Sequence, residues 1–592
     1  MNPIPARVAA LREVMAAHHV DTYIVLSSDA HQSEYVATYW KGRAYISGFT
    51  GSAGTVVITA DKAACWVDGR YFLQGEAQLA GTGIELMKIG EPGVPAWQDY
   101  VVENTPEKGV VGIDGRTLGS FQAIGLKQKL KAKELNLSCA EDLLNEVWTD
   151  RPQLPQDPIF DLPVAYAGES RVEKLTRLRA HMTEKKADYY LIASLESSAW
   201  LLNYRGHDIY ATPVAYAFTL VGQDSCVLFI ETAKVPEDMK ALLQQDGVEV
   251  MPYDALADHL KSLKPSTIDL DKKLINQLLL ESIPEGWKIV EEEIDAVIQM
   301  KALKNETEQA NFRKAHIKDG AVMVRFLKWV KEHADQNMTE CDAAAVLDQM
   351  RVDQENSLGI SFTTIAGYGP NGAIVHYDPE PETCATIHPE SFLLVDSGAQ
   401  YLEGTTDITR TIACGPLTEE EKEAYTLVLK GHLALGHACF KEGATGTALD
   451  ILARKPLWDR GLDYKHGTGH GVGYLLSVHE GPHNISYGVN RVKLEPGMIV
   501  SNEPGFYPTG KFGVRIENLV MVVPYTENEW GRFLRMETLT MCPYEREAIV
   551  KELLTAEEIH QIDAYHQEVY DKVSPLLDEE TRAFLKDITR PL

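Results

Sequence analysis

The sequence predicts an α/β protein with two related N-terminal domains and a third domain that carries most of its polar clusters. Three observations support this prediction: a length of 592 residues, a pattern that recurs at a fixed spacing, and five polar groups that follow strand-like runs. Domains hold about 100–200 residues each, so the chain is too long for one hydrophobic core. We therefore expect three or four compact units.

The first two domains look like copies of each other. Residues 11–25 read Leu-Arg-x-x-Met-x5-Asp-x-Tyr-Ile-Val, and residues 178–192 read Leu-Arg-x-x-Met-x5-Asp-x-Tyr-Leu-Ile, so matched residues lie 167 positions apart. In each copy an amphipathic helix leads into an apolar run suited to a buried strand. A chance match between two common helix–strand patterns is the alternative to two tandem α/β domains.

Changes in pattern along the chain predict four segments. Their limits are residues 1–158, 159–300, 301–544 and 545–592. The Pro-rich stretch 151–158 separates the first two domains, and an acidic run at 293–304 opens the long helical pattern of the third. In the last segment Glu, Lys, Leu and Ile recur at helical spacing, which predicts helices packed on the third domain or on a partner.

Composition narrows the possible partners. The net charge is −29, from 57 basic and 86 acidic side chains. A field of this sign repels phosphate, so we expect no binding to nucleic acid or membranes. The eight cysteines form no Cys-x-x-Cys pair, which predicts reduced thiols in a cytoplasmic protein. Neither a signal peptide nor an apolar run of 18 residues is evident, so we expect no membrane span.

Strand-like runs in the third domain each lead to an acidic residue. Asp396 follows an apolar run, and Asp407 lies among β-branched residues. Their separation of eleven residues suits a hairpin whose two strands lie side by side. Glu503 and Glu517 follow further runs of the same kind. Taken singly, such acids are more often helix caps, turn formers or salt-bridged strand residues.

Residues 466–473 read His-Gly-Thr-Gly-His-Gly-Val-Gly, so every second residue is glycine and two of the others are histidine. The glycine density argues against a helix. In an extended chain the spacing of His466 and His470 places both rings on one face. A flexible loop with incidental histidines is the alternative for this segment alone.

Five residues form a set that is far more specific than any of its members. In chain order they are Asp396, Asp407, His470, Glu503 and Glu517. Oxygen-rich sites with one imidazole suit two divalent ions such as Mn²⁺, with Co²⁺ or Zn²⁺ as alternatives. Four buried carboxylates would repel one another and take up protons, whereas two divalent cations neutralise all four.

These five motifs resemble those of the metal-dependent pita-bread peptidases, which include methionine aminopeptidase, prolidase and aminopeptidase P. Residues 43–54 and 66–72 look like aminopeptidase P, and the match is closest to its long three-domain cytosolic form. The resemblance implies two creatinase/prolidase-type N-terminal domains before a pita-bread catalytic domain. It also implies a cytoplasmic homodimer that hydrolyses peptides with proline in second position. Creatinase shares the fold but lacks this ligand set.

The same resemblance implies roles for individual residues. Asp407 and Glu517 bridge the two ions, Asp396 completes the coordination of one, and His470 and Glu503 complete that of the other. Glu503 is also the candidate general base. His376 and His479 are expected to contact the substrate or the tetrahedral intermediate and so to take part in catalysis. The candidate substrate-binding residues are His376, His466, His479, Tyr507, Arg515 and, from the first domain, Arg70.

Two other functions compete with an aminopeptidase. A prolidase cleaves only Xaa-Pro dipeptides, and the duplicated N-terminal domains favour aminopeptidase P over it. A non-enzymatic binding protein on an inactive peptidase fold should have lost one or more ligands. All five ligand positions are filled in this chain.

Overall fold

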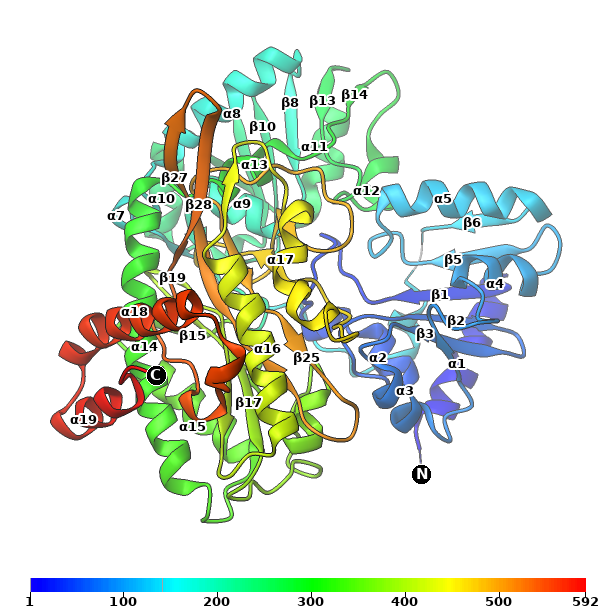
Figure 1. Ribbon diagram of the computed structural model, residues 1–592. Helices are drawn as coiled ribbons and strands as arrows, with labels where there is room; N and C mark the ends of the chain where they lie inside the picture. The colour runs from blue at the N-terminus through cyan, green and yellow to red at the C-terminus, as the bar shows by residue number, and fades with distance from the viewer. Residues whose placement is uncertain (1, 141) are drawn as a thin grey trace. The chain divides into compact units, whose positions relative to one another are not determined.

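The computed structural model describes residues 2–140 and 142–592, which divide into two compact units (Figure 1). The amino-terminal unit comprises Met1–Leu162, Ser170–Tyr210 and Val214–Val297. The carboxy-terminal unit comprises Pro163–Glu169, Ala211–Pro213 and Ile298–Leu592. Within the described residues no helix combines the length and the apolar character that a bilayer crossing requires. The described cysteines are all free thiols.

The amino-terminal unit contains two six-stranded sheets of the same topology. The first has the order β4-β3-β2-β1-β5-β6, and the second has the order β12-β11-β10-β8-β13-β14. The strands of the first sheet are β1 (Thr22–Leu26), β2 (Thr55–Thr59), β3 (Ala63–Val67), β4 (Glu85–Lys88), β5 (Val110–Ile113) and β6 (Asn136–Ser138). Those of the second are β8 (Tyr189–Ile192), β10 (Ala217–Gly222), β11 (Cys226–Ile230), β12 (Glu249–Met251), β13 (Thr267–Asp269) and β14 (Lys288–Val290).

The two sheets are built in the same way from the same sequence pattern. Helix α1 (Ile4–Ala17) leads into β1, and α8 (Arg171–Lys185) leads into β8. Each of these central strands pairs antiparallel with one neighbour and parallel with the other. Tyr23 and Val25 face one apolar cluster while Ile24 and Leu26 face another, so the strand is buried on both sides. The predicted pair of tandem related domains is confirmed.

Shorter helices complete the amino-terminal unit and lead out of it. They are α2 (Gly42–Ser47), α3 (Phe72–Leu79), α4 (Trp97–Asn104), α5 (Ser120–Leu130), α6 (Leu144–Val147), α9 (Leu195–Leu201), α10 (Glu237–Gln245), α11 (Leu256–Ser262), α12 (Gln277–Ser282) and α13 (Ala296–Ala302). The helical pattern predicted to open in the acidic run at 293–304 is not continuous. Helix α13 ends at Ala302, and α14 (Glu306–His333) starts anew because Asn305 and Glu308 form a capping box.

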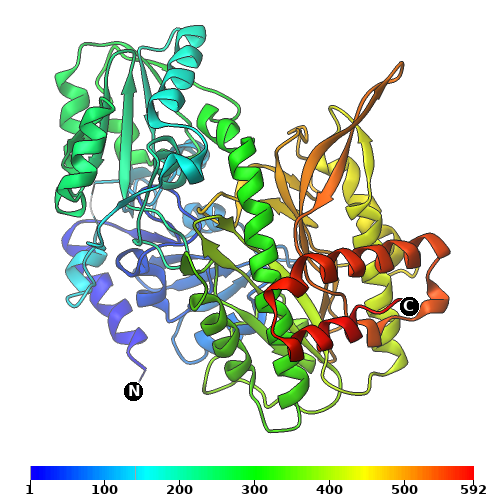
Figure 2. The ribbon, with the colours of Figure 1, turned by 90° about the vertical axis from the view of Figure 1, so that its left-hand side faces the viewer.

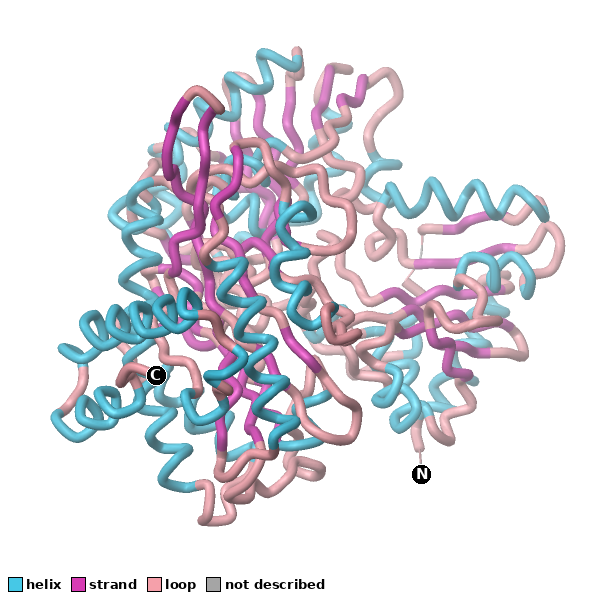
Figure 3. Tube along the Cα trace, in the orientation of Figure 1, coloured by secondary structure: helices cyan, strands magenta, loops and turns pink. Residues whose placement is uncertain are grey.

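Two main sheets organise the carboxy-terminal unit, and Figure 3 distinguishes their strands from the helices. The three-stranded sheet joins β16 (Ile365–Tyr368), β17 (Phe392–Ser397) and β20 (Ile408–Ala413). The six-stranded sheet has the order β21 (Cys439–Lys441), β28 (Gly531–Thr538), β27 (Asn518–Asn528), β24 (Ile499–Asn502), β22 (Gly469–Gly471) and β23 (Glu480–Ile485). Small sheets add β15 (Ser357–Ile360), β18 (Ala399–Tyr401), β19 (Gly404–Thr405), β25 (Gly505–Phe506) and β26 (Val514–Arg515).

A pair of helices covers each main sheet. Helices α14 and α15 (Glu340–Val352) pack their apolar side chains on β17 and β20. Helices α16 (Glu419–Gly436) and α17 (Gly446–Trp458) pack on β24, β27 and β28. This mixed α/β arrangement agrees with the predicted pita-bread fold.

The C-terminal extension packs within the carboxy-terminal unit. Helix α18 (Ala556–Val573) buries Ile562 and Val569 against Tyr425 and Val428 of α16. Helices α18 and α19 (Glu579–Ile588) also lie beside α14, as both views of the chain show (Figures 1 and 2). Of the two predicted positions for this segment, the structure shows the one on the third domain.

A close approach of backbone in the hairpin between β17 and β20 fixes two acidic residues. Asp396 pairs in register with Thr409, and Asp407 immediately precedes β20. Gly398 lies where the hairpin narrows, and a Cβ atom there would collide with the carbonyl oxygen of Thr406 and with Ser361 Oγ. The glycine therefore sets the distance between the strand that carries Asp396 and the segment before β20 that carries Asp407.

We expect Gly398→Ala to destabilise the carboxy-terminal unit by roughly 1–3 kcal/mol, the usual cost of forcing extra volume into a packed site. Chemical denaturation followed by circular dichroism measures this difference. Gly125→Ala is the matched control, because a Cβ atom at Gly125 in α5 meets nothing within 4 Å. Equal stability of Gly398→Ala and the wild type would show that the hairpin has room for a side chain.

Candidate metal centre

The two main sheets of the carboxy-terminal unit bring the five predicted ligands to one place. Asp396 comes from β17, His470 from β22, and Glu503 follows β24 directly. The backbone links the two sheets at Glu517, whose N–H donates to the carbonyl oxygen of Thr409 at 3.1 Å. Strand ends of both sheets therefore converge on one cluster.

Three of the five residues have ligand atoms that could share an ion. The ligand atoms of Asp407, His470 and Glu517 all lie within 4.8 Å of one another. His470 Nε2 lies 3.4 Å from Asp407 Oδ2 and 3.5 Å from Glu503 Oε1. Asp396 joins the group through its electrostatic interaction with Asp407. The structure thus brings together all the residues that the sequence predicted as ligands.

The ring of His470 is oriented by its own backbone. Nδ1 donates to the carbonyl oxygen of Gly471 at 2.9 Å, which leaves Nε2 as the atom that faces the carboxylates. The His470 N–H donates to Ser501 Oγ at 2.9 Å. Burial alone would lower the pKa of His470, but Asp407 and Glu503 outweigh it and raise the pKa to about 9.

The carboxylates are crowded and poorly solvated. Burial raises the pKa of Glu503 to about 7, and repulsion from Asp407 adds to the effect. Burial and the neighbouring acids raise the pKa of Glu517 well above its ordinary value. Asp396 Oδ1 is buried without a hydrogen-bond partner among the described residues. A donor set of four acids and one imidazole with an orphaned oxygen fits divalent cations.

Arg515 connects the cluster to two further predicted residues. Its Nη2 donates to Asp396 Oδ2 at 2.7 Å, and its Nη1 donates to the Tyr507 hydroxyl at 2.8 Å. That hydroxyl lies 2.8 Å from His466 Nε2, while His466 Nδ1 lies 2.7 Å from the Gly467 carbonyl oxygen. Burial and Arg515 lower the pKa of His466 to about 3, so its neutral ring accepts from Tyr507.

The spacing of His466 and His470 predicted that both lie on one face of an extended segment. The structure does not show such a shared segment. Strand β22 begins at Gly469, so only His470 lies in it. The glycines on either side of His470 allow a close approach of backbone: a Cβ at Gly469 would strike the backbone of Ser501, and one at Gly471 that of Glu480. Close packing, rather than strand length, is what these glycines provide.

The remaining predicted residues occupy different settings. The ring of His479 lies 4.3 Å from that of His470, centroid to centroid. His376 is exposed, and its charge contributes to the lowered pKa of His466. Arg70 belongs to the amino-terminal unit, where it pairs with Asp68 at 2.8 Å. Its role at the substrate stays a prediction.

Two hydroxyl residues beside the ligands were not predicted. Thr409 Oγ1 donates to Glu517 Oε2 at 2.7 Å, and Ser501 Oγ donates to Glu503 Oε1 at 3.0 Å. Ser501 precedes Glu503 by two residues, and Thr409 follows Asp407 by two. Alternation along an extended chain places residues at this spacing on the same face, so the signal was present in the sequence.

Glu340 is a further residue that the sequence analysis missed. Its buried carboxylate accepts hydrogen bonds from the Tyr368 N–H at 2.6 Å, the Tyr377 hydroxyl at 2.7 Å and the Ala385 N–H at 2.6 Å. The Asn371 side chain donates to it at 3.0 Å. Glu340 thereby holds the loop that contains His376. Glu340 is the first residue of α15, and no local sequence pattern predicts that an acid at such a position binds a distant loop.

The chain matches several models of known protein families. Residues 310–524 match metallopeptidase family M24, and residues 532–592 match the C-terminal region of the same peptidases. Residues 7–147 and 150–308 each match a creatinase/prolidase N-terminal domain.

Full-length relatives share this arrangement. The chain is 44% identical to a probable Xaa-Pro aminopeptidase P of Laccaria bicolor, over 98% of this chain and 91% of the relative. It is 40% identical to aminopeptidase P2 of Arabidopsis thaliana, over 97% and 86% of the two chains. The structure is similar to that of an X-prolyl aminopeptidase of Caenorhabditis elegans, described as a cytosolic enzyme with a di-nuclear active site. That match has a TM-score of 0.93 and 33% identity, and it covers 99% of each chain.

We expect Asp407→Ala to remove most of the bound divalent metal, because this carboxylate faces both His470 and Glu517. Mass spectrometry of the metals retained after gel filtration measures the loss. Asp459→Ala is the control, since this exposed acid on the surface of the same unit pairs with Lys455. Full metal retention by Asp407→Ala would remove this residue from the ligand set.

Proposed function

The chain belongs to metallopeptidase family M24 and to its Xaa-Pro aminopeptidase P group, and we propose that it removes the first residue of peptides whose second residue is proline. One observation carries the proposal: the five predicted ligands converge at one site in a chain similar along its whole length to an X-prolyl aminopeptidase with a di-nuclear site. This similarity and the complete ligand set support an enzyme over an inactive peptidase-fold binding protein.

For the metal site we propose two divalent ions, Mn²⁺ foremost. Asp407 and Glu517 would serve both ions, Asp396 would hold one of them, and His470 and Glu503 would hold the other. Two contacts support this division: Glu503 lies 3.5 Å from His470, and Arg515 donates to Asp396 at 2.7 Å. Bound ions of this kind lower the pKa of water and polarise a peptide carbonyl.

The chain's own residues then supply proton transfer and orientation. Glu503 accepts the proton of the attacking water, and Ser501 holds its carboxylate in place for this step. His376 and His479 contact the substrate and stabilise the tetrahedral intermediate. Arg515 aligns Asp396, and its charge opposes the rise in the pKa of Asp396 that burial causes.

Buried carboxylates fix the two segments that carry these histidines. Glu340 holds the loop of His376 through its four partners. Glu480, adjacent to His479, is 5% exposed and accepts from Lys301 Nζ at 2.8 Å and from Lys304 Nζ at 2.5 Å. Both histidines are thus presented from rigid supports, although neither lies in a helix.

Proline requires a dedicated subsite, because it has no backbone N–H and its φ angle is fixed. We propose that His466 and Tyr507 line this subsite, with Arg515 behind them, since these side chains form one hydrogen-bonded chain beside the ligands. Arg70 is a further candidate for peptide binding. We also propose a cytoplasmic location, which the similarity to the cytosolic relative supports, and a homodimer, which rests on the resemblance of the sequence to aminopeptidase P.

We expect Arg-Pro-Pro to be cleaved after its first residue and Arg-Ala-Pro to be essentially inert. The reason is that only the first peptide presents a proline ring to the subsite and lacks the second-residue N–H. Chromatographic detection of free arginine measures both rates. Comparable rates would indicate a general aminopeptidase, and cleavage restricted to the dipeptide Arg-Pro would indicate a prolidase.

We expect His479→Ala to keep both ions and to lower kcat/KM by roughly 10²-fold or more, the size expected for a lost proton-transfer or charge-stabilising group. Metal content and kinetics on Arg-Pro-Pro are measured on the same preparation. His437→Ala, which replaces a histidine at the end of α16, is the control and should retain wild-type kinetics. Loss of metal in step with activity would make His479 a ligand, and unchanged kinetics would remove it from the site.

A further inference from the structure

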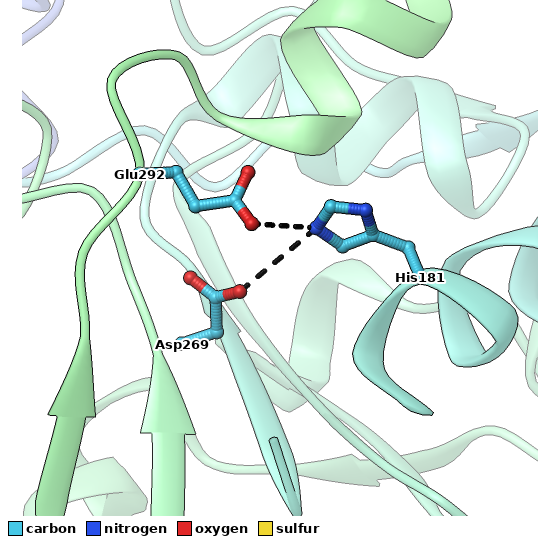
Figure 4. Close-up of side chains that lie close together, drawn as sticks. All are labelled: His181, Asp269 and Glu292. Atoms are coloured by element: carbon cyan, nitrogen blue, oxygen red, sulfur yellow. Dashed lines mark hydrogen bonds and ion pairs between the residues drawn. The ribbon is translucent and has the colours of Figure 1, made fainter. Parts of the chain in front are cut away.

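A second cluster of ligand-type side chains lies within the amino-terminal unit (Figure 4). It consists of His181 from α8, Asp269 at the end of β13 and Glu292 just after β14. His181 Nε2 lies 2.8 Å from Glu292 Oε1 and 4.0 Å from Asp269 Oδ2. The three ligand atoms all lie within 4.8 Å of one another. None of these residues belongs to the peptidase site.

Asp269 is the member that its protein surroundings do not satisfy. Its side chain is 1% exposed, and its Oδ2, which points towards His181, has no hydrogen-bond partner among the described residues. A buried carboxylate oxygen without a partner is costly unless something else neutralises it. Burial, Glu292 and Asp295 together raise the pKa of Asp269 to about 7.

Lys185 lies near the cluster, but it pairs with Glu292 and not with Asp269. Lys185 Nζ lies 3.2 Å from Glu292 Oε1, and its side chain is 42% exposed. The cluster together with the nearby Asp295 contains three acids, so one lysine does not balance their charge. Asp295 accepts a hydrogen bond from the Tyr190 hydroxyl at 2.7 Å. Among the described residues Asp269 is therefore the acid of the cluster without a lysine or arginine partner.

The cluster is specific to the second of the two duplicated domains. The residue of α1 that corresponds to His181 is Val14, at the same offset of 167 that relates the copies. Asp269 pairs with Tyr190 in the second sheet, and Gly112 pairs with Tyr23 at the equivalent place in the first. The shared fold thus forms without these side chains, so they are not required by its architecture.

We propose that His181, Asp269 and Glu292 bind one Zn²⁺ ion, with a water molecule as the fourth ligand. Zn²⁺ takes imidazole and carboxylate ligands at bond lengths of about 2.0–2.2 Å, which places tetrahedral ligand atoms about 3.3–3.6 Å apart. The distances from His181 Nε2, 2.8 and 4.0 Å, lie on either side of this value. Small side-chain rotations therefore suffice to form the site. The bound ion ties α8 to the ends of β13 and β14 and gives Asp269 Oδ2 its missing partner.

Metal counting on the full-length protein tests this site separately from the peptidase centre. The wild type and three variants, His181→Ala, Asp269→Asn and Glu292→Gln, are equilibrated with excess Zn²⁺, freed of unbound metal and analysed by mass spectrometry. We expect each variant to hold one Zn²⁺ per chain fewer than the wild type. Glu292→Gln changes a loop residue, so it keeps the test informative if a variant with a buried substitution fails to fold.

His18→Ala is the matched control, because His18 also pairs with a carboxylate in this unit, Glu146 Oε1 at 2.8 Å, and lies outside the proposed site. It should hold as much Zn²⁺ as the wild type. Equal Zn²⁺ content in the wild type and in the folded cluster variants would overturn the proposal and leave an ion-paired histidine. The outcome does not depend on peptide cleavage, so failure of the proposed peptidase function would not imitate it.

Discussion

Mutual repulsion among four crowded carboxylates is the constraint on which the carboxy-terminal unit depends. Two like charges 4 Å apart repel by about 4 kcal/mol at an effective dielectric constant of 20. Arg515 supplies one buried positive charge, which pairs with Asp396. Burial raises the pKa of Glu503 and Glu517, and repulsion from the neighbouring acids raises it further. Such an arrangement persists only because two sheets, a narrow hairpin at Gly398 and close-packed glycines around His470 hold the acids in place. Two divalent cations would convert this repulsion into attraction.

In the hydrogen-bonded chain of Arg515, Tyr507 and His466, each group can act in only one way as donor or acceptor. Arg515 can only donate, so the Tyr507 hydroxyl accepts from it and is free to donate to His466. The neutral ring of His466 uses its remaining N–H to donate a hydrogen bond to the Gly467 carbonyl oxygen. Because each group has one possible role, the side chains have few alternative conformations. The surface beside the proposed ligands is consequently well defined without help from a bound peptide.

The sequence revealed those features that have local causes. The apolar runs before Asp396 and Glu503 predicted strands that end in acids, because buried strands need apolar residues and the ligands follow them in the chain. The offset of 167 residues revealed the duplicated domains through their shared helix–strand pattern. By contrast, the partners of Glu340 and the cluster of His181, Asp269 and Glu292 are assembled by tertiary folding from residues far apart in sequence. The predicted domain limits and the assigned roles of the site residues stay predictions.

Glu340 has a consequence for the thermodynamics of peptide recognition. Much of the loop from Gly369 to Ala385 lacks regular secondary structure, yet one buried carboxylate gathers its backbone and side chains at several points. The conformational entropy of this loop is therefore lost when the protein folds, not when a ligand arrives. A tripeptide offers few contacts, so an ordering penalty at the moment of binding would weigh heavily on its affinity. By removing that penalty in advance, the Glu340 carboxylate would favour the binding of short peptides at the proposed site.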